Sequence, residues 1–209
     1  MPFFYQQNIN ETAHLAIWSI QEPASFFETD VQLAIPIANE ERRIQHLAVR
    51  LLFKLMMPEV DLSQLVMADN GKPYLMGLPF HFSFSHCKGY AACAVDDHQP
   101  IGIDIEIIHP RIAKVAHKFL NDAEKGMLEG LDEPSKLNQM AFLWAAKEAM
   151  YKQHEQLGID FAKDFNVLGL TDGAQGTVKA QILHKGIDLS VALDYHFGAD
   201  YICVTCYRS

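Results

Sequence analysis

The sequence has no long uninterrupted apolar segment and few cysteines. No hydrophobic run approaches the roughly 20 residues that cross a bilayer, and residues 1–6 lack the positive charge and apolar run of a secretory leader. Four cysteines in 209 residues are too few and too scattered for a disulfide framework. Cys203 and Cys206 form a Cys-x-x-Cys pair, which we interpret as structural because no second pair completes a zinc site. We therefore expect reduced thiols, no membrane segment and a cytoplasmic location.

Basic residues are also scarce. The chain has 17 Lys plus Arg against 26 Asp plus Glu, a net charge of −9. Because such a surface repels phosphate backbones, nucleic-acid binding is disfavoured. The hydrophobic fraction of 49% is ordinary for a globular protein and argues against disorder. We find no internal repeat and no low-complexity tract.

Hydrophobic periodicity predicts a mixture of helices and strands. Asn39 is a good N-cap for a helix that ends before Pro58, and residues 101–107 alternate strictly between apolar and polar. Helical spacing recurs at 111–120, 122–131 and 135–156, and strand patterns occur at 81–86, 90–95, 101–107, 177–183, 187–195 and 201–207. Residues 69–73 have the composition of a turn. We predict an α+β protein with two similar-sized halves, 1–100 and 101–209, each a small, mainly antiparallel sheet packed with helices.

Two carboxylates occupy one face of the strand predicted at 101–107. Asp104 and Glu106 are two residues apart, so their backbones lie about 6–7 Å apart on the same face. Their repulsion is relieved by a divalent cation, and an all-carboxylate set favours Mg²⁺ or Mn²⁺ over zinc. A solvent-exposed strand face would explain the same pattern.

The helix predicted at 135–156 carries three functional side chains at intervals of four. Trp144, Glu148 and Lys152 therefore share one helix face. Glu148 and Lys152 could be a stabilising surface pair. Alternatively, Glu148 is a third metal ligand or a base, and Lys152 neutralises a phosphate.

Basic residues also form a stripe on the helix that follows Asn39. Arg50 and Lys54 follow Arg43 by seven and eleven residues, which places all three beside the apolar face. Arg42 points well away from this stripe. The stripe is either a solvated edge with its aliphatic stems on the apolar surface or an anion site.

Four short motifs occur in order along the chain. They are Gly71-Lys72-Pro73, Phe82-Ser83-Phe84-Ser85-His86, Gly102-Ile103-Asp104-Ile105-Glu106, and the segment from Trp144 through Lys147-Glu148 to Lys152. Together they resemble the 4′-phosphopantetheinyl transferases of the monomeric, pseudo-twofold type that activates surfactin synthetase. The resemblance implies two pseudo-twofold halves with the active site between them. It also implies holo-[acyl-carrier-protein] synthase activity: Mg²⁺-dependent transfer of 4′-phosphopantetheine from coenzyme A to a serine of an apo carrier protein, with release of 3′,5′-ADP.

The resemblance also implies residue roles. Asp104, Glu106 and Glu148 would hold the metal, Lys152 would contact the pyrophosphate, and Glu148 would accept the serine proton. In the first half, Arg43 or Arg50 would bind the 3′-phosphate of coenzyme A together with His86, and Lys72, Pro73 and Ser85 would contact the nucleotide. Glu124 matches a glutamate that the family often has there, with a structural or supporting role.

The segment 111–119 is a candidate docking surface for the carrier protein. Such carriers are acidic, so a local basic patch must attract them. Arg111, Lys114 and Lys118 lie at helical spacing beside an apolar line of Ile112, Val115 and Phe119. An amphipathic core helix would show the same pattern. We expect a monomer, and the alternative functions are an inactive coenzyme A or carrier-protein binding module and a Mg²⁺-dependent nucleotide phosphohydrolase.

Overall fold

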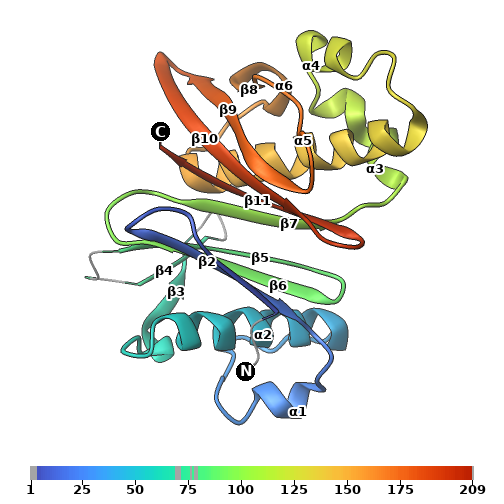
Figure 1. The fold of residues 1–209 in the computed structure, drawn as a ribbon. Helices are drawn as coiled ribbons and strands as arrows, with labels where there is room; N and C mark the ends of the chain where they lie inside the picture. Colours follow the sequence, from blue (N-terminus) through green and yellow to red (C-terminus); the bar gives the residue numbers. More distant parts are fainter. Residues whose placement is uncertain (1–3, 69–71, 76, 78–79, 209) are drawn as a thin grey trace. The chain divides into compact units, whose positions relative to one another are not determined.

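The chain folds into two compact units, Met1–His98 and Gln99–Ser209 (Figure 1). The computed structural model describes residues 4–68, 72–75, 77 and 80–208. The turn predicted at 69–73 lies outside these residues at positions 69–71, including Gly71 of the first motif.

The first unit packs one long helix on a four-stranded antiparallel sheet. Its elements are β1 (Tyr5–Asn8), β2 (Ala13–Ser19), α1 (Ala24–Phe27), α2 (Glu40–Met56), the 3₁₀ turn η1 (Leu62–Gln64), β3 (Leu65–Met67), β4 (Pro73–Leu75), β5 (His81–Cys87) and β6 (Tyr90–Asp96). The sheet order is β1-β2-β6-β5, and β3 pairs with β4 in a separate ribbon. Helix α2 begins as predicted, because the Asn39 side chain accepts a hydrogen bond from the Arg42 backbone amide. On the inner face, Phe53 of α2 stacks on Phe82 of β5 at 4.6 Å.

The second unit places a 22-residue helix on a five-stranded antiparallel sheet. Its elements are β7 (Gly102–Ile107), α3 (Arg111–Val115), η2 (Ala116–Lys118), α4 (Asp122–Met127), α5 (Glu133–His154), α6 (Phe161–Asp164), β8 (Phe165–Val167), β9 (Gln175–His184), β10 (Ile187–Phe197) and β11 (Tyr201–Arg208). The strand order is β7-β11-β10-β9-β8. Helix α5 runs along β7 and β11 (Figure 1).

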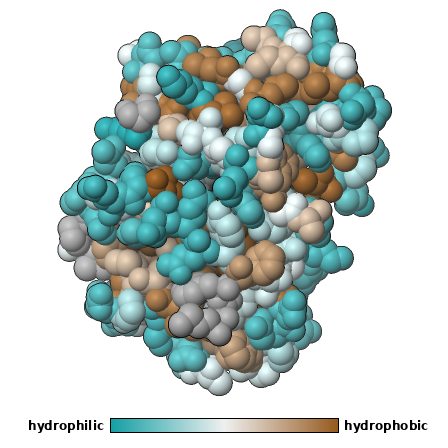
Figure 2. Space-filling view, in the orientation of Figure 1, coloured by the Kyte–Doolittle hydropathy of each residue, from teal (hydrophilic) through white to brown (hydrophobic). Residues whose placement is uncertain are grey.

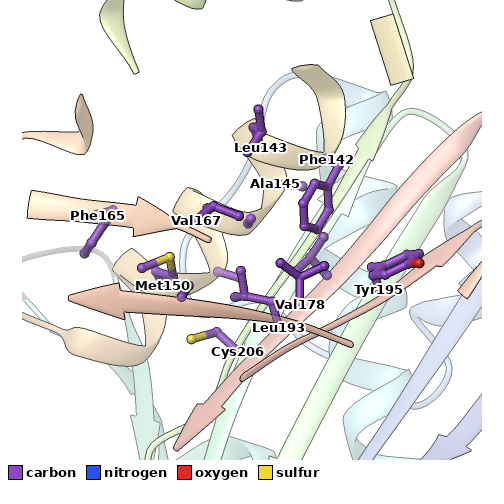
Figure 3. Packing of buried hydrophobic residues seen from close by; sticks show 14 of the residues in the cluster. Phe142, Leu143, Ala145, Met150, Phe165, Val167, Val178, Leu193, Tyr195 and Cys206 are labelled. Atoms are coloured by element: carbon purple, nitrogen blue, oxygen red, sulfur yellow. The ribbon is translucent and has the colours of Figure 1, made fainter. Parts of the chain in front are cut away.

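The core of the second unit lies between α5 and the sheet. Figure 3 shows Phe142 and Met150 of α5 packed over Val178 and Leu193 of the long strands β9 and β10. Cys206 of β11 belongs to this core, and burial raises the pKa of its thiol. Cys203 is likewise buried and forms no disulfide. Burial of both cysteines in strand β11 agrees with a structural role for the Cys-x-x-Cys pair.

The mixed α+β architecture with antiparallel sheets is confirmed, and several local predictions need correction. The helix predicted at 111–120 is a five-residue α-helix followed by the 3₁₀ turn η2. Strands β1 and β2 were not predicted.

Hydrophilic residues cover much of the face shown in Figure 2. Within the described residues, no helix is both long and apolar enough to span a bilayer.

Candidate active site

A glycine sets how closely helix α5 approaches strand β7. A Cβ atom at Gly102 would overlap the carbonyl oxygen of Ala149 and lie 2.6 Å from the backbone nitrogen of Gln153. Only glycine allows this approach without moving the helix. Helix α5 therefore covers the polar face of β7. This excludes the alternative that Asp104 and Glu106 simply lie on a solvent-exposed strand face.

The close approach joins the two predicted carboxylate motifs. Lys152 Nζ donates to Asp104 Oδ1 at 2.7 Å and to the Ile103 carbonyl oxygen at 2.9 Å. The Trp144 indole Nε1 donates to Glu106 Oε1 at 3.3 Å. Side chains that are about 40 residues apart in sequence therefore meet on one face of β7. Lys152 forms its ion pair with Asp104 and also acts electrostatically on Glu148.

Burial, together with nearby negative charge, raises the pKa of two of the carboxyl groups. Burial, reinforced by the charge of Asp104, raises the pKa of Glu106 to about 7. Burial and the same Asp104 charge also raise the pKa of Glu148 to about 7, although Lys152 opposes the shift. The nearby Lys152 cation thus compensates only part of the negative charge that three ionised carboxylates would carry.

This donor set suits a hard divalent cation. Three carboxylates without a sulfur or imidazole ligand favour Mg²⁺ or Mn²⁺. A cation would also relieve the repulsion that adds to the effect of burial on the two pKa values. Among the described residues, however, no three His, Cys, Asp or Glu side chains converge closely enough to hold a metal as they stand. Lys152 occupies one oxygen of Asp104 in this arrangement.

A buried ion pair supports the same helix from its other side. Lys147 Nζ donates to Glu124 Oε2 at 2.7 Å, and both side chains are fully buried. Lys147 also donates to the carbonyl oxygens of Phe119 and Phe161, at 2.7 and 2.9 Å. Glu124 Oε1 accepts from the Val167 amide at 3.1 Å. The pair ties α5 to α4, α6 and β8, so Glu124 has a structural role.

An open pocket of about 700 Å³ adjoins Trp144. Its walls include Val115 and Lys118 from the predicted docking segment and Phe161 from α6. Trp144 therefore contacts Glu106 and also lines an apolar recess. Lys118 is exposed, whereas Val115 packs against the core.

The first unit contains a separate pocket with cationic groups. It has a volume of about 720 Å³, and Arg42, His46 and Arg50 of α2 line it at intervals of four residues. Apolar side chains from residues 33–37 and from β3 form other walls. Arg50 NH1 donates to the His46 carbonyl oxygen at 2.9 Å, and the His46 ring lies 4.6 Å from the His86 ring.

The basic stripe predicted on α2 is therefore divided. Arg43 forms a 2.8 Å ion pair with Glu28, and Lys54 lies 3.7 Å from Asp30. The prediction that Arg42 points away from Arg50 is wrong for the pocket, since both line it. Around the helix axis, Arg50 lies between Arg42 on one side and Arg43 with Lys54 on the other. Glu28 and Asp30, which follow β2 in the chain, attract Arg43 and Lys54.

The other predicted nucleotide contacts lie on β4 and β5. His86 shares the α2-facing side of β5 with Phe82 and Phe84, while Ser85 is buried on the opposite side. Pro73 begins β4 and is paired with Met67, which lines the pocket. Lys72 precedes Pro73 and accepts a backbone hydrogen bond from Ala68. The structure thus brings His86 against His46, which lines the Arg50 pocket, but it does not bring Ser85 to the same side of the strand.

Sequence reasoning did not select Arg42 and His46 as functional residues. The spacing from Arg42 through His46 to Arg50, four residues at each step, was the signal that could have identified them.

The match to a protein family lies in the second unit. The sequence model of one family, described as the 4′-phosphopantetheinyl transferase superfamily, matches residues 100–206, slightly more than half of the chain. The chain belongs to this superfamily. The match includes β7 and α5, and hence the carboxylates and Lys152.

Individual members of the superfamily are similar over segments of comparable length. The chain is 37% identical over 118 residues to the 4′-phosphopantetheinyl transferase Sfp of Bacillus subtilis strain 168, covering 56% of this chain and 52% of that protein. It is 35% identical over 113 residues to 4′-phosphopantetheinyl transferase psf-1 of Bacillus pumilus, covering 53% and 47%. A third protein, a 4′-phosphopantetheinyl transferase of Bacillus subtilis, is 38% identical over 86 residues, covering 41% and 38%. The chain thus spans about half or less of the length of these relatives.

Proposed function

We propose that this protein transfers 4′-phosphopantetheine from coenzyme A to a serine of an apo carrier protein. The observation that carries the proposal is the meeting of Asp104, Glu106, Glu148 and Lys152 on β7 and α5, within the segment that matches the superfamily. The similar proteins are named 4′-phosphopantetheinyl transferases.

The side chains of the second unit suit phosphoryl transfer. Asp104, Glu106 and Glu148 would hold Mg²⁺ or Mn²⁺, which when bound offsets negative charge on the pyrophosphate. Lys152 would exchange its contact with Asp104 for the pyrophosphate oxygens. The serine oxygen attacks the phosphorus that bears pantetheine, the bond from that phosphorus to the bridging oxygen breaks, and 3′,5′-ADP leaves. Glu148 would accept the serine proton.

The pocket of the first unit suits the 3′-phosphate of coenzyme A. Arg50 has a half-buried guanidinium in the pocket, where burial lowers its pKa, and His86 is brought near through its contact with His46. We therefore favour Arg50 over Arg43, which is engaged by Glu28. Arg42 joins the proposed site because it lines the same pocket.

A shared topology supports the proposed pseudo-twofold organisation. In the first unit β2 leads to α2 and then to the hairpin β5–β6, with sheet order β2-β6-β5. In the second unit β7 leads to α5 and then to the hairpin β10–β11, with order β7-β11-β10. Both units thus contain the same strand–helix–hairpin pattern.

We further propose that the acidic carrier protein docks on the segment from Arg111 to Lys118. Arg111, Lys114 and Lys118 are exposed, which favours an electrostatic contact. Ile112 and Val115 pack partly against the core, so they contribute less apolar surface to a partner than the sequence pattern suggested.

Mass spectrometry tests the activity directly. An apo carrier protein incubated with this protein, coenzyme A and Mg²⁺ should gain one phosphopantetheine group, and EDTA should abolish the gain. Glu148→Gln should also abolish it, whereas Glu129→Gln, at an exposed position, should not. Binding of coenzyme A without any gain on fatty-acid, polyketide or peptide-synthetase carriers would instead favour a binding module. Phosphate release from nucleotides without a carrier would favour a phosphohydrolase.

A further inference from the structure

His46 lies between two arginines in the pocket of the first unit. Arg42 and Arg50 stand one helical turn before and after it on α2, and all three line the same pocket. From β5, the ring of His86 lies 4.6 Å from the His46 ring. Among the residues that the structure describes, the other lining segments, 32–39 and 62–67, contribute no acidic or basic side chain to the pocket. The described charged groups that line the pocket beside His46 are therefore cationic.

The contacts of His46 indicate a neutral imidazole in the ligand-free protein. His46 Nδ1 lies 3.3 Å from Arg50 NH1. Because a guanidinium nitrogen can only donate, Nδ1 must accept, and the ring proton is then on Nε2. Consistently, burial and the charges of Arg50 and Arg42 lower the pKa of His46 to about 4.

A bound phosphate would reverse the sign of this environment. A phosphomonoester carries close to two negative charges at neutral pH, and two guanidinium groups leave little excess positive charge once it binds. An imidazolium between those arginines then gains an attractive partner instead of only repulsive ones. Protonating His46 also adds a donor to the pocket.

We propose that His46 is a phosphate-binding residue that takes up a proton when a phosphomonoester dianion enters this pocket. The identity of that dianion, the 3′-phosphate of coenzyme A, rests on the proposed function. If binding favours the protonated imidazole, the affinity for the dianion must rise as the pH falls through the pKa that His46 has in the complex. Proton uptake, rather than a fixed positive charge, distinguishes His46 from Arg42 and Arg50.

Isothermal titration calorimetry measures the linked proton. The full chain is titrated with coenzyme A, without carrier protein, at pH 7 in buffers of high and low ionisation enthalpy. Wild type should take up a fraction of one proton, and His46→Gln should lose that uptake. His98→Gln, an exposed histidine in the same unit, should retain it. Dephospho-coenzyme A lacks the phosphomonoester and should give no uptake with either protein.

Nuclear magnetic resonance of wild type gives a second readout that does not depend on the variant's folding. The titration midpoint of the His46 imidazole resonance should lie below pH 6 in the free protein and above pH 6 when coenzyme A is bound. Equal proton uptake by wild type and His46→Gln, an unshifted His46 titration, or no binding of coenzyme A would overturn the inference. Failure of carrier modification alongside proton-linked binding would refute the transferase activity while supporting the role of His46.

Discussion

Replacing Lys147 with methionine should strongly destabilise the second unit. Lys147→Met keeps the length of the side chain but removes the ammonium group that contacts Glu124 and two backbone carbonyl oxygens. The Glu124 carboxylate would remain fully buried, held by the backbone amides of Val167 and Asn121. An uncompensated charge is thus left inside the protein.

The expected loss of stability follows from this burial. Removing one partner of a buried ion pair costs about 3–5 kcal/mol because the other charge stays desolvated. The carbonyl oxygens of Phe119 and Phe161 lose a donor as well, which places Lys147→Met toward the upper end of that range. Since whole domains are stable by roughly 5–15 kcal/mol, the effect should be easily measured.

Urea unfolding at pH 7 measures the free energy of unfolding of wild type and variants. Glu124→Leu should be destabilising on its own. The double variant Glu124→Leu/Lys147→Met should lose less than the sum of the two single changes, because no charge remains buried. Lys125→Met is the control: it removes an exposed pair with Asp122 on α4 and should change stability little.

Two results would contradict this reasoning. A loss of less than about 1 kcal/mol for Lys147→Met would show that the buried carboxylate is readily protonated or hydrated. Additive effects in the double variant would show that Lys147 and Glu124 are not energetically coupled.

Three further predictions concern the site. Gly102→Ala should lower the melting temperature and reduce carrier modification, because the added Cβ would push α5 away from β7. The control Gly126→Ala places a Cβ with no atom within 4 Å and should be tolerated. Equal melting temperatures of the two variants would refute the close approach. Arg50→Ala should raise the KM for coenzyme A about tenfold or more, as expected for the loss of a charged hydrogen bond. The control Arg43→Ala should leave this KM unchanged. Similar changes in KM for both variants would contradict the division of the basic stripe. The pKa of His46 falls from 6.5 unfolded to about 4 folded, so the unfolded state binds the extra proton and stability is lost as pH drops across that range. Urea midpoints between pH 7 and 4 should fall less steeply in His46→Gln, and parallel curves would show that His46 does not contribute.

Local sequence signals were sufficient for the elements that carry the site. The Asn39 cap predicted the start of α2, and strict alternation placed Asp104 and Glu106 on one face of β7. Helical spacing likewise placed Glu148 and Lys152 on α5. These features depend on neighbours within a few residues, and the sequence motifs themselves carried the resemblance to the family that the comparisons confirm.

Contacts between distant elements were beyond such local signals. Spacing offered Glu148 as one possible partner of Lys152, whereas Lys152 bonds to Asp104, because the packing of α5 against Gly102 brings β7 within its reach. Spacing also grouped Arg43 with Arg50, but Glu28 draws Arg43 away and leaves Arg50 beside His46. The sequence by itself determined which side chains share a face of a helix or strand, because backbone geometry repeats at fixed intervals. Only the tertiary structure decided which partner each side chain meets, because that choice depends on the surface packed against the face.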